Sequence, residues 1–507
     1  MSEKTISVQT KPPYGMIAIL FIGAFVAILN ETLLNIALPA IMEEFKVNAT
    51  AVQWLSTGYM LINGILIPAS AFFIQRFTDK KLFIIAMALF TLGTFLASIA
   101  PAFGVLLGAR MIQAAGSAIM MPLLMNVMLT AFPVEKRGAA MGMFGLVMIT
   151  APAIGPTLSG WLIEHYSWRM LFDLVLPIAI LTLIFAAFKL KNVTPQRPIK
   201  LDVLSLVLSS IGFGGLLYGF SSAGEKGWDN ILVYGTIIIG ALALITFILR
   251  QLRMDEPMLE FRIFKYPMFA LSTTISIVIS VAMFSAMILM PIYVQTIRGI
   301  SPMDSGLLML PGAIVMGIMS PITGKLFDKY GARTLAVIGL IITIVTTYYF
   351  SKIGLHTAYS TLVLLYTLRM FGMSMVMMPV MTNGLNQLPA YNNPHGTAMN
   401  NTLQQVSGAI GSAVLITVMN NITTVKAEEL AAKAMNNMSA NAAQASAHAT
   451  AEVQQQIMNE AMLHGINFTF FISTLITVIA LILAFFIKRV KPNQVIDMEI
   501  QRDVQGE

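Results

Sequence analysis

Glu31, Arg110 and Asp173 are ionisable residues that lie inside long apolar runs of this 507-residue sequence. A charged side chain within a membrane is costly, so it normally pairs with another group or faces a water-filled cavity. A carboxylate in that setting can take up a proton on one side of the membrane and release it on the other. A nearby arginine, which stays charged, favours the release. These residue types therefore indicate proton transfer across a membrane.

Glu31 is the strongest candidate for the proton-carrying residue, because it is the acid nearest the middle of an apolar run. Arg110 lies about six positions inside its run, and Asp173 about four positions inside its own. Each residue has an alternative role. Glu31 can be a neutral or water-bridged structural group, Arg110 can extend its charge to the interface, and Asp173 can sit at the external interface.

The sequence lacks the residue patterns of a membrane enzyme. It has no cysteine, which excludes disulfides, thiolate metal sites and a cysteine nucleophile. Its five histidines are scattered, with none at metal-ligand spacing. We find no HExxH, no GxSxG, no phosphate-binding loop and no pair of carboxylates spaced for catalysis. We therefore expect no enzyme activity, no metal and no cofactor, with a proton gradient in place of ATP as the energy source.

The elements that must position these residues are transmembrane helices, which gives an all-α polytopic membrane protein. Hydrophobic residues make up 57% of the chain and charged residues 11%, whereas soluble domains carry about 25% charged residues. A spanning helix needs about 20 mostly apolar residues, and such runs are too long and continuous for the strands of a β-barrel. Fourteen segments qualify: 14–38, 51–74, 82–100, 104–130, 138–163, 169–189, 201–222, 231–250, 268–295, 305–322, 334–353, 358–381, 396–420 and 465–487.

The distribution of lysine and arginine predicts the orientation. With the N-terminus in the cytoplasm, the cytoplasmic segments carry 22 of these residues and the external segments seven, while Arg110 and Arg369 lie within spans. Basic residues favour the cytoplasmic side, so both termini are expected there. Arg369 begins its span, and we expect its charge to reach the interface. Residues 421–464 then form a long external loop, either solvated helix or partly disordered, with a lid or partner-binding element as the alternative.

Internal similarity predicts two homologous halves. RMIQAAGSAIMMP (110–122) resembles RMFGMSMVMMP (369–379), about 259 residues later. Spans 1–6 and 9–14 are therefore expected to form two six-helix bundles, with spans 7 and 8 inserted between them. The predicted parts are an N-terminal bundle (1–200), two inserted helices (201–255) and a C-terminal bundle (256–507).

GKLFDKYGAR (324–333) is the most specific motif. Gly324 and Gly331 permit close helix approach and a tight turn. Asp328 can cap backbone N–H groups or pair with Arg333. The segment resembles the signature loop of the major facilitator superfamily, in which such a loop holds one bundle against the other. The first-half copy, QRFTDKKLF (75–83), keeps Asp79 but lacks both glycines.

Two further motifs resemble those of exporters in this superfamily. ARMIQAAGSA (109–118) resembles the fourth-span motif that is linked to proton coupling. APAIGPTLSG (151–160) resembles the antiporter motif of the fifth span, where Gly155 and Pro156 are expected to kink the helix and allow tight packing.

LNETLLNIALPAI (29–41) and VQWLSTGYML (52–61) resemble the first two spans of the fourteen-span drug:proton antiporters. Further sequence segments along the chain are similar to the lincomycin-resistance exporters of that branch. That branch usually has Asp where this chain has Asn30, and Glu31 supplies the acid one position later. Because one helical position is about 100° of rotation, the acid faces a different direction or the helix is rotated. The resemblance implies a substrate cavity lined by polar and aromatic residues: Asn30, Asn35, Gln53, Trp54, Tyr59, Gln113 and Gln404.

The resulting hypothesis is a proton-coupled exporter of amphipathic drugs, with lincosamides among the candidate cargoes, working by alternating access in the bacterial cytoplasmic membrane. Its expected partners are small amphipathic substrates, protons and the lipid bilayer, with no nucleic acid, and the protein is expected to be a monomer. The alternative is a dedicated exporter of an endogenous metabolite or lipid. A membrane enzyme or a non-transporting sensor is the third possibility.

Overall fold

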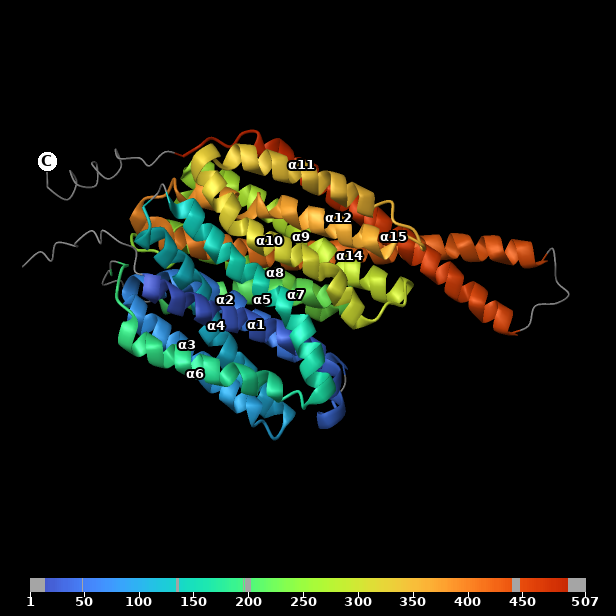
Figure 1. Ribbon diagram of the computed structural model, residues 1–507, viewed down its shortest axis with the longest axis horizontal. Coiled ribbons are helices and arrows are strands. Elements are labelled where there is room, and N and C mark those ends of the chain that lie inside the picture. The colour runs from blue at the N-terminus through green and yellow to red at the C-terminus, as the bar shows by residue number, and fades with distance from the viewer. Residues whose placement is uncertain are drawn as a thin grey trace, which may run out of the picture.

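We describe a computed structural model of the chain over residues 14–47, 49–133, 136–194, 196, 202–439 and 447–490. These residues form α-helices joined by short turns, and no strand occurs among them. Figure 1 shows the helices packed side by side along one direction. The prediction of an all-α membrane protein is therefore confirmed.

The first six helices make one bundle. They are α1 (Tyr14–Phe45), α2 (Ala49–Arg76), α3 (Asp79–Ser98), α4 (Phe103–Ala131), α5 (Arg137–His165) and α6 (Met170–Lys189). The inserted pair follows as α7 (Val203–Lys226) and α8 (Ile231–Arg253).

The remaining helices make the second bundle. They are α9 (Pro267–Ile292), α10 (Pro302–Tyr330), α11 (Ala332–Phe350), α12 (Tyr359–Ser374), α13 (Met377–Leu385), α14 (Asn393–Ser439) and α15 (Ala447–Ala484). Short turns of 3-10 helix lie at Phe261–Lys265 and Ala390–Asn392, and a π-helical turn at Tyr293–Ile297 continues α9. Helices α12 and α13 together form one span, Tyr359–Leu385.

Length and composition of the helices agree with the expected number of spans. Among the described residues, 13 helices are long and apolar enough to cross a membrane, and the shorter apolar helix Pro267–Met283 in α9 accounts for the fourteenth. Many large apolar side chains lie exposed on the outer faces, such as Phe188 at 82% and Ile231 at 69%. Such faces suit lipid rather than water.

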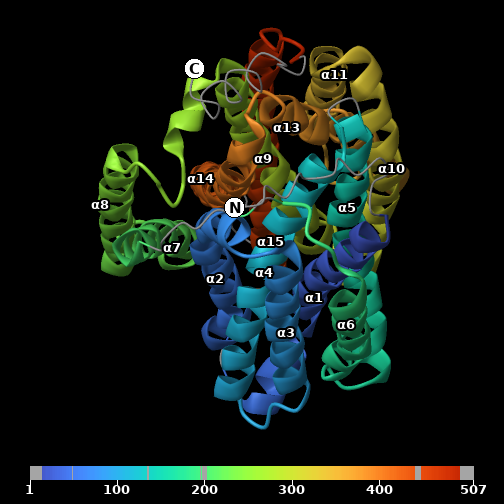
Figure 2. The same cartoon turned by 90° about the vertical axis from the view of Figure 1, so that its left-hand side faces the viewer.

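The buried apolar side chains form two main clusters. One lies mainly on α1–α6 and includes Leu20, Phe90 and Phe172, while the other lies mainly on α9–α15 and includes Phe350 and Phe470. Figure 2 shows how the bundles meet: α5 adjoins α10 on one side, while α7 adjoins α2 and α14 on the other.

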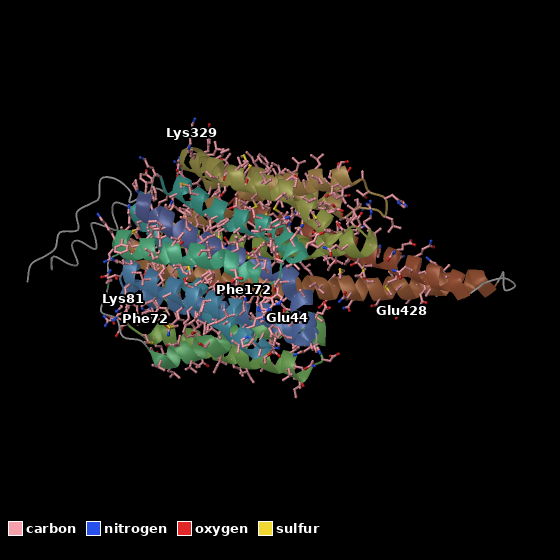
Figure 3. The ribbon with its side chains drawn as sticks, turned by 60° about the horizontal axis from the view of Figure 1, so that its bottom comes forward. Glu44, Phe72, Lys81, Phe172, Lys329 and Glu428 are labelled. Atoms are coloured by element: carbon pink, nitrogen blue, oxygen red, sulfur yellow. The ribbon has the colours of Figure 1, made fainter. Side chains whose placement is uncertain are left out.

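The two ends of the molecule differ. At one end, termed the basic end, α1 begins, α15 finishes, and Lys81 and Lys329 lie exposed (Figure 3). At the other, termed the hairpin end, α14 and α15 project together beyond the other helices (Figure 1). The projecting parts, 421–439 and 447–464, are helical, which confirms the helical alternative for that loop over the residues described.

Candidate functional site

A buried arginine on α4 organises a polar cluster inside the N-terminal bundle. Arg110 is 1% exposed, and its Nη1 donates to Asn30 Oδ1 at 2.7 Å and to Gln113 Oε1. Gln113 Nε2 in turn donates to Thr94 Oγ1 at 2.7 Å. The ring of Tyr59 covers the guanidinium, with 4.3 Å from its centroid to Arg110 Cζ. Arg110 therefore does not extend to the interface but is held inside the bundle by α1, α2 and α4.

The partners that touch Arg110 in this cluster are uncharged. Asn30 and Gln113 are amides and Tyr59 offers the face of its ring, an arrangement that attracts the cation but does not neutralise it. A buried charge is costly unless an opposite charge compensates it. Arg110 is therefore expected to attract a carboxylate that lies nearby.

Glu31 is that carboxylate. It follows Asn30 on α1, is partly buried, and interacts electrostatically with both Arg110 and Tyr59. From the sequence, either the acid at position 31 faces a different direction from the usual one, or helix α1 is rotated to compensate. In the structure Asn30 contacts Arg110 directly, and Glu31 lies one position further along α1, about 100° around the helix.

Helix α5 packs closely behind this part of α1. Gly155 leaves no space for a Cβ, which would overlap the hydroxyl oxygen of Thr32. Ser159 Oγ donates to the Leu33 carbonyl oxygen at 2.6 Å. The tight packing predicted for the fifth-span motif is therefore present next to Glu31. Pro156 lies within α5, but its side chain is outside the described part of the structure.

Two other residues predicted for the substrate cavity, Trp54 and Gln404, make their contacts elsewhere. Trp54 stacks on Tyr218 of α7, with ring centroids 5.7 Å apart. Gln404 of α14 contacts Met381 Sδ at 3.6 Å, within the C-terminal bundle. The side chains of Asn35 and Gln53 are outside the described part of the structure.

Asp173 lies away from the Arg110 cluster. It occupies the first turn of α6, is exposed, and accepts a hydrogen bond from Ser98 Oγ at 2.6 Å. Nearby, Arg169 forms an ion pair with Glu44 at 2.6 Å, close to the hairpin end of α1. This position fits the interfacial alternative for Asp173, because the start of a spanning helix is where a carboxylate can remain hydrated.

Arg369 contradicts the expectation that its charge reaches the interface. It is fully buried in α12, its Nη2 donates to the Ala282 carbonyl oxygen at 2.8 Å, and its Nε donates to Thr347 Oγ1 at 3.2 Å. It thus joins α12 to α9 and α11. The similarity between the segments that begin at Arg110 and Arg369 was the signal in the sequence that could have indicated burial in both halves.

Asp328 connects the two bundles at the basic end. Its Oδ1 accepts from the Gly138 N–H at 3.0 Å and its Oδ2 accepts from the Ala139 N–H at 3.1 Å. These N–H groups lie in the first turn of α5 and have no partner within that helix. A negative charge at this position also complements the helix dipole. Of the two roles left open for Asp328, capping is the one found. We term this contact the basic-end latch.

Two glycines make the basic-end latch possible. A Cβ on Gly324 would overlap the Gly138 carbonyl oxygen, so α10 and α5 touch through their backbones. Gly331 has φ +82°, a conformation that favours glycine, and it ends α10 so that α11 can begin at once. Arg489 donates to the Asp328 carbonyl oxygen at 2.6 Å, closing the end of α10. Arg333 is exposed in the first turn of α11.

The first-half copy of the motif holds a different contact. Asp79 is buried, and its Oδ2 accepts from the backbone N–H groups of Val193 and Thr194, both at 2.8 Å. Those residues follow α6 in the same half of the chain. Asp79 therefore fixes the connector after α6, whereas Asp328 joins one bundle to the other.

Sequence reasoning missed two other contacts between the bundles at the basic end. Arg137 Nη1 donates to Asn386 Oδ1 at 3.2 Å, and the Gln75 amide lies 2.9 Å from His395 Nε2. His395 Nδ1 also accepts from the Glu260 N–H at 3.2 Å. Together with the basic-end latch, these contacts close the basic end. Because each pair is more than 130 residues apart in sequence, no local pattern indicates it.

Comparison with known proteins agrees with this architecture. The sequence model of the Major Facilitator Superfamily matches residues 20–412. The MFS-type transporter YhcA of Bacillus subtilis is 48% identical over 96% of this chain and 95% of its own length. The lincomycin resistance protein LmrB of the same organism is 43% identical over 94% of this chain and 96% of its own.

The fold comparison is independent of close sequence similarity. The crystal structure of the human organic anion transporter MFSD10 superposes with a TM-score of 0.66, covers 94% of this chain and 100% of its own, and shares 11% sequence identity. The matched family consists of membrane transporters and not of enzymes. The family match, together with the 13 long apolar helices and one shorter apolar helix among the described residues, shows that this chain belongs to the major facilitator superfamily.

Proposed function

We propose that this protein exports amphipathic drugs in exchange for protons, with Glu31 as the residue that carries the proton. The observation that carries the proposal is the environment of Arg110. This cation is buried against uncharged partners, Asn30, Gln113 and Tyr59, and Glu31 lies within its electric field.

The two states of Glu31 affect this cluster differently. When Glu31 is ionised, it attracts Arg110 and the buried charge is compensated. When Glu31 binds a proton, or when a cationic drug takes its place beside the carboxylate, that attraction is lost or shared. Proton and drug then exclude each other at one residue, which is the requirement for exchange. Thr32 and Leu33, held by α5, transmit any change in this part of α1 to the neighbouring helix.

The conformational part of the cycle follows from the basic-end latch. In the described state the basic end is closed by Asp328, by the Arg137–Asn386 contact and by the Gln75–His395 contact. Opening it requires those contacts to break together, as expected for two bundles that rock about a central site. With the basic end in the cytoplasm, as the lysine and arginine distribution predicts, this is the state that faces outward.

The substrate class in this proposal is supported by the relatives. LmrB of Bacillus subtilis is named for lincomycin resistance, and it matches this chain over nearly its full length. We therefore include lincosamides among the candidate cargoes, beside other amphipathic drugs. The domain limits of 1–200, 201–255 and 256–507 belong to the same proposal, with the first part carrying the proton and the third closing the basic end.

Glu31→Gln tests the proposal because it keeps the shape of the side chain and removes its titration. In inside-out vesicles, the wild type should release protons when lincomycin or ethidium is added, and a pH gradient should drive their uptake. Glu31→Gln should abolish both while the purified protein still binds an uncharged drug. Glu43→Gln is the matched control, since Glu43 is exposed near the end of the same helix.

Two results would contradict the assignment. If Glu31→Gln still accumulates drug with the pH dependence of the wild type, the coupling residue lies elsewhere. If the wild type moves drug equally well without a gradient, and no protons are released, the protein is not a proton antiporter.

A further inference from the structure

Helix α7 spans the junction between the two bundles. On one side it packs on α2, where Gly64 leaves space that Leu217 fills and where Trp54 stacks on Tyr218. On the other side it packs on α14, and Trp228, just after α7, donates from its Nε1 to Thr417 Oγ1 at 2.7 Å. Figure 2 shows α7 lying beside both α2 and α14. The inserted pair therefore forms a wall across the seam between the bundles.

Behind this wall lies a pocket of about 310 Å³. Its lining comes from α2, α7, α14 and Met287 of α9. That volume is within the range of about 300–1,000 Å³ that is typical of small-molecule sites. Because α7 contributes Leu217 and Tyr218, the pocket would be open on this side without the inserted helices.

The pocket is separate from the Arg110 cluster. Helix α2 stands between them and serves both with different residues. Tyr59 covers Arg110, while Thr57 and Met60 line the pocket. A molecule in this pocket would therefore not contact the coupling cluster directly, although the two sites share one helix.

The lining is apolar with a few uncharged polar groups. Met60, Met287 and Leu217 supply apolar contacts, whereas Thr57 and Gln405 supply hydrogen-bonding groups. Among the described residues that line the pocket there is no carboxylate to attract a cation.

A lysine contacts one of the residues that line the pocket. Lys226 Nζ donates to the Tyr218 hydroxyl at 3.1 Å, so a positive charge sits at the edge of the pocket. A flexible, methionine-containing surface suits ligands of varied shape, and the lysine disfavours positive ones.

We propose that the pocket between α2, α7, α9 and α14 binds uncharged amphipathic molecules, and that the inserted helices exist in part to form it. The site deepens the proposed drug export by giving neutral compounds a place apart from the carboxylate that competes for cations. Binding there requires no proton, so the pocket can be tested independently of coupling.

The experiment measures binding of two tritiated probes to the full-length protein in lipid nanodiscs. Progesterone is the uncharged probe and tetraphenylphosphonium the lipophilic cation. Ser412→Trp places a bulky ring in the pocket lining, and Val414→Trp on the exposed face of the same helix is the matched control. We expect Ser412→Trp to weaken progesterone binding at least tenfold and Val414→Trp to leave it unchanged.

A second variant covers the case in which Ser412→Trp does not fold. Thr57→Asp adds a carboxylate to the pocket and should likewise weaken progesterone binding about tenfold, while strengthening retention of tetraphenylphosphonium. Unchanged progesterone binding in a folded variant of either kind overturns the proposal, as does a wild type that binds no progesterone. Glu31→Gln should keep progesterone binding. If the proposed proton coupling is wrong, only the transport measurements will contradict it. If the proposed pocket is wrong, only the progesterone binding measurements will contradict it.

Discussion

Asp328→Asn is the sharpest perturbation of the basic-end latch, because it changes one atom of a residue that joins the two bundles. The aspartate accepts from Gly138 and Ala139 with separate oxygens, at 3.0 and 3.1 Å. Asparagine has one accepting oxygen. Its other terminal group is a donor, which would face a backbone N–H that is also a donor.

The expected magnitude follows from these contacts. A hydrogen bond to a charged group contributes about 1.5–3 kcal/mol net, and a carboxylate at a helix N-terminus adds about 0.3–1 kcal/mol. One bond and the charge are lost, while one weaker bond remains, so we expect the closed state to lose about 2 kcal/mol. This is about a thirtyfold change in the equilibrium between closed and open. A closed-to-open ratio of about 100 to 1 would fall to about 3 to 1.

Distance measurements between spin labels can follow this change, since the native sequence has no cysteine. Labels at Lys81→Cys and Lys329→Cys report on the basic end from the two bundles (Figure 3). In Asp328→Asn a second, longer distance should appear, while drug affinity in detergent changes little. Asp255→Asn, which removes an exposed acid from the connector before α9, is the control.

Two outcomes would refute this reasoning. One is a distance distribution in Asp328→Asn identical to that of the control. The other is a large loss of drug affinity with normal exchange between the two distances, which would make the loop part of the binding site and not a latch.

Two further predictions concern topology and packing. In intact cells, a membrane-impermeant maleimide should label a cysteine at Glu428 and not one at Lys329; the reverse would invert the orientation deduced from the basic residues. Gly155→Ala should destabilise the protein by about 1–3 kcal/mol through overpacking against Thr32, and thermal unfolding should show it. Gly160→Ala, on the same helix with open space around its Cα, should be neutral, and equal effects of both changes would exclude the packing argument.

The number and places of the spans were predictable because a membrane imposes a minimum apolar length on each helix. The length of α14 was not. Its expected span ends at residue 420, yet the helix continues to Ser439, since the alanine, glutamate and lysine that follow are strong helix formers. A hydropathy criterion detects where the membrane stops and not where a helix stops.

The direction of individual side chains was harder to predict. A helix that is apolar on all sides has no polar face to orient it, so Trp54, Gln404 and Arg369 could be placed in spans but not on faces. The structure turns Trp54 toward α7 and buries Arg369. Asp328 was predictable to a greater extent, because the dense motif of glycines and charges around it indicates a turn and an acid that can cap N–H groups, although the capped groups lie on α5, outside the motif.

The projecting hairpin of α14 and α15 acts as a lever. Each of its helices is a direct continuation of a helix in the C-terminal bundle, so it must turn with that bundle as a rigid pointer. The part of α14 beyond residue 420 is about 28 Å long at 1.5 Å per residue. If the bundle rotates by 10° about the point where the projecting part begins, the tip moves by about 5 Å. If the centre of rotation lies deeper in the bundle, the tip moves further. Anything attached near Glu428 would report, or resist, a motion that originates at the basic end.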